Sequence, residues 1–248
     1  MAEPALPVLV ALAAAAALVL GLLKTSVGGG IGLTLTPLLT LILPPSAVLG
    51  LLGCLMVLSD PISLRMYWRR WEAGLLRRLI PSSLVGIVLG AWLLAGLSEA
   101  GLRRLIGAAA LLMAGLTLVG LPRAPRPHPH DSPVVSAGVG VTMGVASVVA
   151  NSGGIILGPY LAGLGLSNAA VVGTGQAVVT VANVLKLAAY WAIGFVTLKL
   201  VLLAVLVTPL VYLGSLVGYR LNARLPRRAL ALTLIAIAIA GGAKLLLG

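Results

Sequence analysis

The stretch 24-KTSVGGGIGLTLTP-37 interrupts an apolar segment with a lysine, two hydroxyl side chains and three consecutive glycines. Glycine lets the backbone turn sharply and lets a ligand approach main-chain N–H groups. The apolar segment that follows, 31–43, would be about 20 Å long as a helix, which is shorter than a hydrocarbon core of about 30 Å. The stretch therefore predicts a broken helix inside a membrane.

The composition of the whole chain is that of a membrane protein. Its 248 residues are 60% hydrophobic and 9% charged, and the mean hydropathy is +1.15. Residues 132–185 contain no charged side chain, and this run is long enough for two crossings of about 20 residues each. Strands with alternating polar and apolar residues are absent, so we predict an all-α, polytopic membrane protein.

The net charge of +12 does not indicate a nucleic-acid partner, because the basic residues cluster in short loops between apolar runs. The expected surroundings are the lipid bilayer. The sequence shows no phosphate-binding loop and no nucleophile paired with a base, so we expect no enzyme. His128, His130 and Asp131 lie on a proline-rich loop, where a solvated linker is favoured over a metal site, and we expect neither metal nor cofactor.

A proline-rich connector, 121–133, divides the chain into two nearly equal parts. We predict a first transmembrane repeat at 1–120, a cytoplasmic linker at 121–133 and a second transmembrane repeat at 134–248. Several features of the two parts align at a spacing of 123 residues: Asp60 with Asn183, Tyr67-Trp68 with Tyr190-Trp191, and Gly28-Gly29-Gly30 with Asn151-Ser152-Gly153. This near-constant spacing indicates a duplication.

Loop charge predicts the orientation of the repeats. Arginines gather in 65–78, in the central connector and in 220–228, and these loops should be cytoplasmic. Both termini should then lie outside, and an odd number of segments per repeat makes the repeats inverted. Inverted repeats with interrupted helices are typical of secondary transporters. The sequence leaves open whether 5–43 and 134–165 are full crossings or re-entrant hairpins.

The two breaks are candidate anion sites. A helix that begins after each break directs unpaired N–H groups and the positive end of its dipole at the break, which suits a small anion. The alternative is that the glycines only permit close helix packing. The candidate ligands at the breaks are Ser26, Gly28, Gly29, Gly30, Asn151, Ser152, Gly153 and Gly154.

Polar side chains on the neighbouring segments complete the predicted site. Gln176, Asn183 and Lys186 form one stripe of a helix, and Lys24 lies four residues before Gly28. A lysine in a membrane helix is costly unless it meets an anion or reaches the interface, and for Lys186 both interpretations stay open.

Asp60 precedes Pro61 in the first repeat. Near Lys24 or Lys186 it would form an ion pair, whereas alone it would be protonated. A carboxylate within a membrane is also a candidate proton carrier, and a structural role at the proline bend is equally credible.

Three stretches carry a family resemblance: VGGGIGLTLTPLL at 27–39, NSGGIILGPYL at 151–161 and GTGQAVVTVANVLKLAAYWAIGFV at 173–196. With them the sequence resembles the TauE/SafE family of sulfite exporters, or DUF81-type permeases. The resemblance implies a permease for sulfite or an organosulfonate. It assigns Gly28 to Gly30 and Ser152 to Gly154 to the family's two glycine turns, and Asn183 with Lys186 to its polar pair. It assigns no role to Asp60.

The resulting expectation is a permease of the cytoplasmic membrane that works by alternating access, with protons as a candidate coupling ion and Asp60 as their candidate carrier. A passive anion channel and a permease for another small organic anion stay as alternatives. A permease for cations is disfavoured because acidic residues are few and the breaks carry lysines. A homodimer is compatible with the sequence.

Overall fold

The computed structural model describes residues 6–27, 31–120, 132–222 and 227–247, and all regular structure within them is helical. The all-α prediction is therefore confirmed. The helices are α1 (Leu6–Val27), α2 (Ile31–Thr40), α3 (Pro45–Met66), α4 (Ala73–Ala95), α5 (Glu99–Gly120), α6 (Pro133–Ala150), α7 (Gly153–Gly163), α8 (Asn168–Ala192), α9 (Leu198–Asn222) and α10 (Arg227–Leu247).

Eight helices in the described ranges are long and apolar enough to cross a membrane. The remaining two, α2 and α7, have 10 and 11 residues and are only about 15 Å long. The helix predicted at 31–43 ends at Thr40, where the chain enters a turn that brings the N–H of Leu43 to the carbonyl of Leu39. These features confirm a multi-pass membrane protein with interrupted helices.

Each short helix folds back along the helix before it. The hydroxyls of Ser136, near the start of α6, and Tyr160, near the end of α7, are hydrogen-bonded at 2.8 Å. In the first half, Leu9 of α1 and Leu43 after α2 line the same cavity. The pairs α1–α2 and α6–α7 are therefore helical hairpins, each made of one helix long enough to span a membrane and one short helix.

The predicted linker ends one residue earlier than expected, because Pro133 is the first residue of α6. Proline is tolerated there since the N–H that it lacks would have no partner within the helix. Residues 121–131 of the linker, with both histidines, lie outside the described residues.

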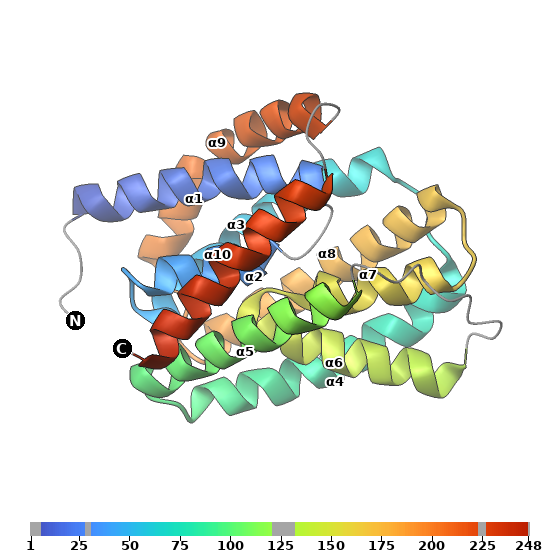
Figure 1. The fold of residues 1–248 in the computed structure, drawn as a ribbon, viewed down its shortest axis with the longest axis horizontal. Helices are drawn as coiled ribbons and strands as arrows, with labels where there is room; N and C mark the ends of the chain where they lie inside the picture. The colour runs from blue at the N-terminus through green and yellow to red at the C-terminus, as the bar shows by residue number, and fades with distance from the viewer. Residues whose placement is uncertain (1–5, 28–30, 121–131, 223–226, 248) are drawn as a thin grey trace.

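The pattern of helix pairs is unchanged when the two halves of the chain are exchanged (Figure 1). α1 packs along α9 and α4 packs along α6 at opposite edges of the molecule, while α3 and α8 meet in the middle and α5 packs on α10. Exchanging the halves converts the α1–α9 pair into the α6–α4 pair. A two-fold relation between repeats would produce this order, and the inverted orientation in the membrane stays a prediction.

Glycines allow the closest of these contacts. A Cβ added to Gly21 would overlap the carbonyl oxygen of Val211, and one added to Gly214 would overlap that of Leu18. The α4–α6 pair is built the same way, with Gly144 against the carbonyl of Ser83. Small residues let helix backbones approach where lipid removes the hydrophobic drive for association.

We expect Gly21→Ala and Gly214→Ala to lower the thermal unfolding midpoint of the detergent-solubilised protein, because the new methyl group collides with backbone atoms of the facing helix. Gly115→Ala is the matched control, since nothing lies within 4 Å of its added Cβ. That change should be neutral or stabilising by up to about 1 kcal/mol through helix propensity. Equal midpoints for all three variants would contradict the packing.

Candidate functional site

The second break lies against the start of the first short helix. Asn151 ends α6 in the left-handed conformation, with φ 53° and ψ 30°, which asparagine adopts more readily than most residues. Gly32, in the first turn of α2, packs so closely on Asn151 that an added Cβ would overlap it. The tip of the α6–α7 hairpin and the first turn of α2 thus meet inside the bundle.

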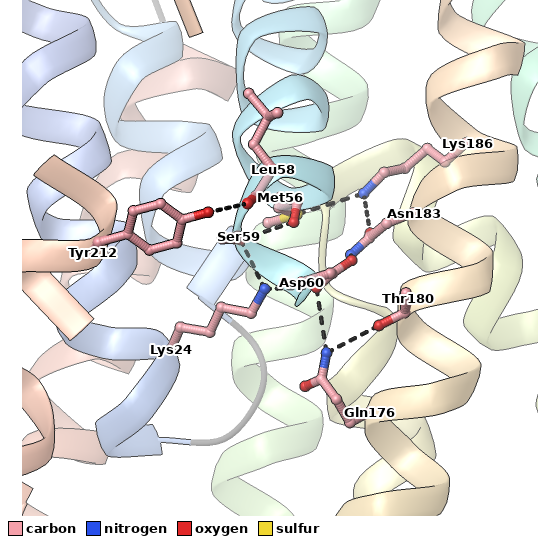
Figure 2. Close-up of polar contacts among 10 residues, drawn as sticks. All are labelled: Lys24, Met56, Leu58, Ser59, Asp60, Gln176, Thr180, Asn183, Lys186 and Tyr212. Atoms are coloured by element: carbon pink, nitrogen blue, oxygen red, sulfur yellow. Dashed lines mark hydrogen bonds and ion pairs between the residues drawn. The ribbon is translucent and has the colours of Figure 1, made fainter. Parts of the chain in front are cut away.

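Asp60 of α3 lies at the centre of the polar contacts. Its Oδ1 accepts hydrogen bonds from Lys24 Nζ at 2.6 Å and from Gln176 Nε2 at 3.3 Å, and its Oδ2 accepts one from Asn183 Nδ2 at 2.9 Å. Figure 2 shows Lys24 reaching the carboxylate from one side and the two amides of α8 from the other. The predicted ion pair exists, and Lys24 is the partner.

Asp60 and Asn183, which the repeat alignment makes equivalent, contact each other directly. Equivalent residues can touch only at or near the axis that relates them. The contact is therefore the arrangement expected if α3 and α8 cross at the pseudo-two-fold axis.

Lys186 lies deep in the bundle and does not reach its surface. Its side chain is fully buried. The ammonium donates to Asn183 Oδ1 at 2.9 Å and to Asn151 Oδ1 at 2.7 Å, and it lies 3.5 Å from Met56 Sδ. All three contacts are with uncharged groups, which separates this lysine from the charge-paired Lys24.

The contacts continue from Asn151 to α2. Asn151 Nδ2 donates to Thr36 Oγ1 at 3.3 Å, and the Thr36 hydroxyl donates to the carbonyl of Ala150. At the other end, Lys24 also donates to Ser59 Oγ at 2.7 Å. We call the connected residues the central polar network: Ser59, Lys24, Asp60, Gln176, Asn183, Lys186, Asn151 and Thr36.

Three predicted residues at the second break lie beside this network without joining it through side chains. Ser152 is buried, but its hydroxyl donates to the carbonyl of Ala150. Gly153 packs against Met143 of α6, and Gly154 is half-buried. The backbone N–H of Ser152 donates to the carbonyl of Ala146 at 3.2 Å, whereas the N–H groups of Gly153 and Gly154 stay predicted ligands. Gly28, Gly29 and Gly30 lie outside the described residues, as does the side chain of Ser26.

Several polar residues of the site were not predicted. Thr36 belongs to the stretch that marked the break, and Ser59 precedes Asp60 in the chain. Thr180 lies four residues after Gln176 and accepts a hydrogen bond from it at 3.1 Å. A search for hydroxyl side chains one helical turn from each predicted ligand would have found Thr180, whereas Thr36 depends on how the hairpins pack.

The network carries the charge and donors of an anion site. It contains two ammonium groups and one carboxylate, which leaves one formal positive charge. Amide groups of Gln176 and Asn183 add neutral donors. Within the described ranges, no three His, Cys, Asp or Glu side chains gather as metal ligands would. A small anion is the ligand that this set of groups suits best.

We expect Asp60→Ala to lower the unfolding midpoint strongly. Breaking a buried pair leaves an uncompensated charge, which costs about 3–5 kcal/mol. Lys24→Met in the same chain should recover part of the loss, because it removes the ammonium that Asp60 neutralises. Thermal unfolding of the two single variants and the double variant measures this coupling, and additive losses would show that the pair is not coupled.

Comparison with known proteins gives the chain a family. No curated protein and no solved structure matches it. One family model matches residues 13–245, nearly the whole length, and its description is "Sulfite exporter TauE/SafE". The match includes most of α1, the whole of α2, α3, α6, α7 and α8, and every residue of the central polar network. The chain therefore belongs to the sulfite exporter TauE/SafE family, a family of membrane transporters.

Proposed function

We propose that this protein is a secondary transporter that moves a small sulfur-containing anion, sulfite or an organosulfonate, across the cytoplasmic membrane. The observation that carries the proposal is the ammonium of Lys186, which is fully buried and contacts only uncharged groups. A buried cation within a membrane protein is costly, and binding an anion offsets this cost. Family membership supports the same chemistry.

The broken helices add to the attraction for an anion. The first N–H groups of a helix have no partner within it, and its N-terminus carries partial positive charge. The first turn of α2 contacts Asn151, which holds Lys186 through its side-chain oxygen. An anion that replaced this oxygen on Lys186 would therefore lie close to a helix N-terminus.

Alternating access would use the same contacts. The central polar network joins α1, α2 and α3 of the first half to Asn151 and α8 of the second half by side-chain hydrogen bonds. Such bonds exchange partners without unfolding a helix. Rocking of the α1–α9 pair against the α4–α6 pair, each of which combines helices from both halves, would expose the bound anion to each side in turn. Protonation of Asp60 would free Lys24 for the anion and so couple transport to protons.

Purified protein in liposomes should take up sulfite or methanesulfonate, and Lys186→Ala should weaken binding about 10-fold or more through loss of a buried charge contact. The double variant Lys24→Ala/Lys186→Ala should lose binding. Lys244→Ala is the control, because this lysine is exposed on α10. Unchanged affinity in the double variant would remove the charged-site model.

Accumulation of the anion against its gradient distinguishes a transporter from a passive anion pore. A transporter coupled to protons accumulates the anion against its gradient when a proton gradient is imposed. A pore only dissipates the gradient and carries voltage-driven current at channel rates. Accumulation that collapses when a protonophore is added would exclude the pore.

The proposed orientation is tested by labelling. Cys54 is buried, so the native chain should react weakly with a membrane-impermeant thiol reagent. A cysteine at the exposed Arg69 should react only from the cytoplasmic side, and one at the exposed Thr197 only from the outside. The opposite pattern would reverse the proposed topology and place both termini inside.

A further inference from the structure

We propose that Asp60 sets the charge of the transported ion, so that this protein selects anions with one negative charge over anions with two. The inference rests on the proposed function and goes beyond it, because neither the family description nor the transport mechanism specifies the charge of the substrate. It concerns the balance of charges within the central polar network.

The Asp60 carboxylate already occupies a complete oxyanion site. One ammonium and two side-chain amides donate to its two oxygens, and the side chain is 2% exposed. These are the donors that would bind the oxygens of a sulfonate or a sulfite. Asp60 is thus a tethered anion that neutralises one of the two lysines whenever it is ionised.

The second lysine has no such partner in its contacts. Lys186 is held by the side-chain oxygens of Asn151 and Asn183 and by the thioether of Met56. At the position that the repeat alignment makes equivalent to Asp60, the chain has the neutral Asn183. With each group in its charged form, the three ionisable groups of the network therefore sum to one positive charge rather than to zero or two.

A net charge is costly in a medium of low dielectric constant, and the cost rises with the square of the charge. An anion with one negative charge brings the sum at the network to zero. A dianion leaves the sum at −1 and must also shed a larger hydration shell. The site should therefore prefer the monoanion even when the two ions have the same shape.

Methanesulfonate and sulfate are matched probes for the test. Both are tetrahedral oxyanions of sulfur with similar size, and they keep one and two negative charges across neutral pH, whereas sulfite changes its charge there. The wild-type protein in liposomes should bind and move methanesulfonate in preference to sulfate. Asp60→Asn raises the network to two positive charges and should shift the preference toward sulfate by about 10-fold or more.

Two further variants separate charge from shape. Asp60→Glu retains the negative charge and should keep the preference for methanesulfonate, whatever its rate. Asp60→Asn/Lys186→Gln returns the network to one positive charge and should restore that preference. Lys186→Gln alone leaves a sum of zero and should weaken methanesulfonate binding about 10-fold or more, which provides a test that does not require Asp60→Asn to fold.

The outcomes separate this inference from the proposed function. An unchanged ratio in folded Asp60→Asn, or full methanesulfonate affinity in Lys186→Gln, overturns the role of Asp60 while leaving anion transport intact. A wild-type protein that prefers sulfate also overturns it. A wild-type protein that moves neither sulfite nor any of the probes contradicts the proposed function itself.

Discussion

The carboxylate of Asp60 joins the two halves of the chain, because it pairs with Lys24 of its own half and accepts hydrogen bonds from Gln176 and Asn183 of the other. It lies within a membrane-spanning helix, where a lone negative charge is costly, so its position is stable only if cationic and polar groups surround it. Lys24 comes from the first hairpin and Asn183 from α8 of the second half. Because one buried carboxylate needs these partners, α1 and α8 are held against α3. The contact lies near the predicted pseudo-two-fold axis between the repeats.

Two kinds of contact hold the remaining helices, because lipid provides little hydrophobic drive for one apolar helix to associate with another. At the edges of the bundle, glycines such as Gly21 and Gly214 bring the backbones of α1 and α9 together. In the middle of the bundle, side-chain hydrogen bonds hold α3 and α8 together. The close backbone contacts leave no room for displacement, whereas hydrogen bonds exchange partners readily, so under the proposed transport cycle the rearrangement would occur among the charged side chains.

The pairing of helices supports this division. Edge pairs α1–α9 and α4–α6 each combine a helix from one half with a helix from the other. Each edge pair would move as a unit, because a displacement within it would drive backbone atoms into one another. Motion between the units would then be absorbed at α3 and α8, where Asp60, Asn183 and Lys186 meet.

The network is also more extensive than any one motif of the sequence indicates. Asn151 binds Lys186 through its oxygen and Thr36 through its nitrogen, so a single amide links the second break to the first short helix. Its left-handed backbone conformation places the side chain at the hairpin tip. A glycine there would keep the turn and lose both hydrogen bonds, which accounts physically for a break that reads Asn-Ser-Gly-Gly rather than a run of glycines.

The helices and their breaks are predictable from the sequence, because long apolar runs interrupted by glycine, proline and charge leave a membrane chain few other ways to satisfy its backbone. It also placed Asn183 and Lys186 on one helix face, since that spacing is local. Three features emerge only when the helices pack: Asp60 pairs with Lys24, the buried Lys186 contacts uncharged groups, and Ser152 bonds to its own turn. Those outcomes depend on the depth and rotation of helices relative to one another, which are set by close packing between residues far apart in the chain.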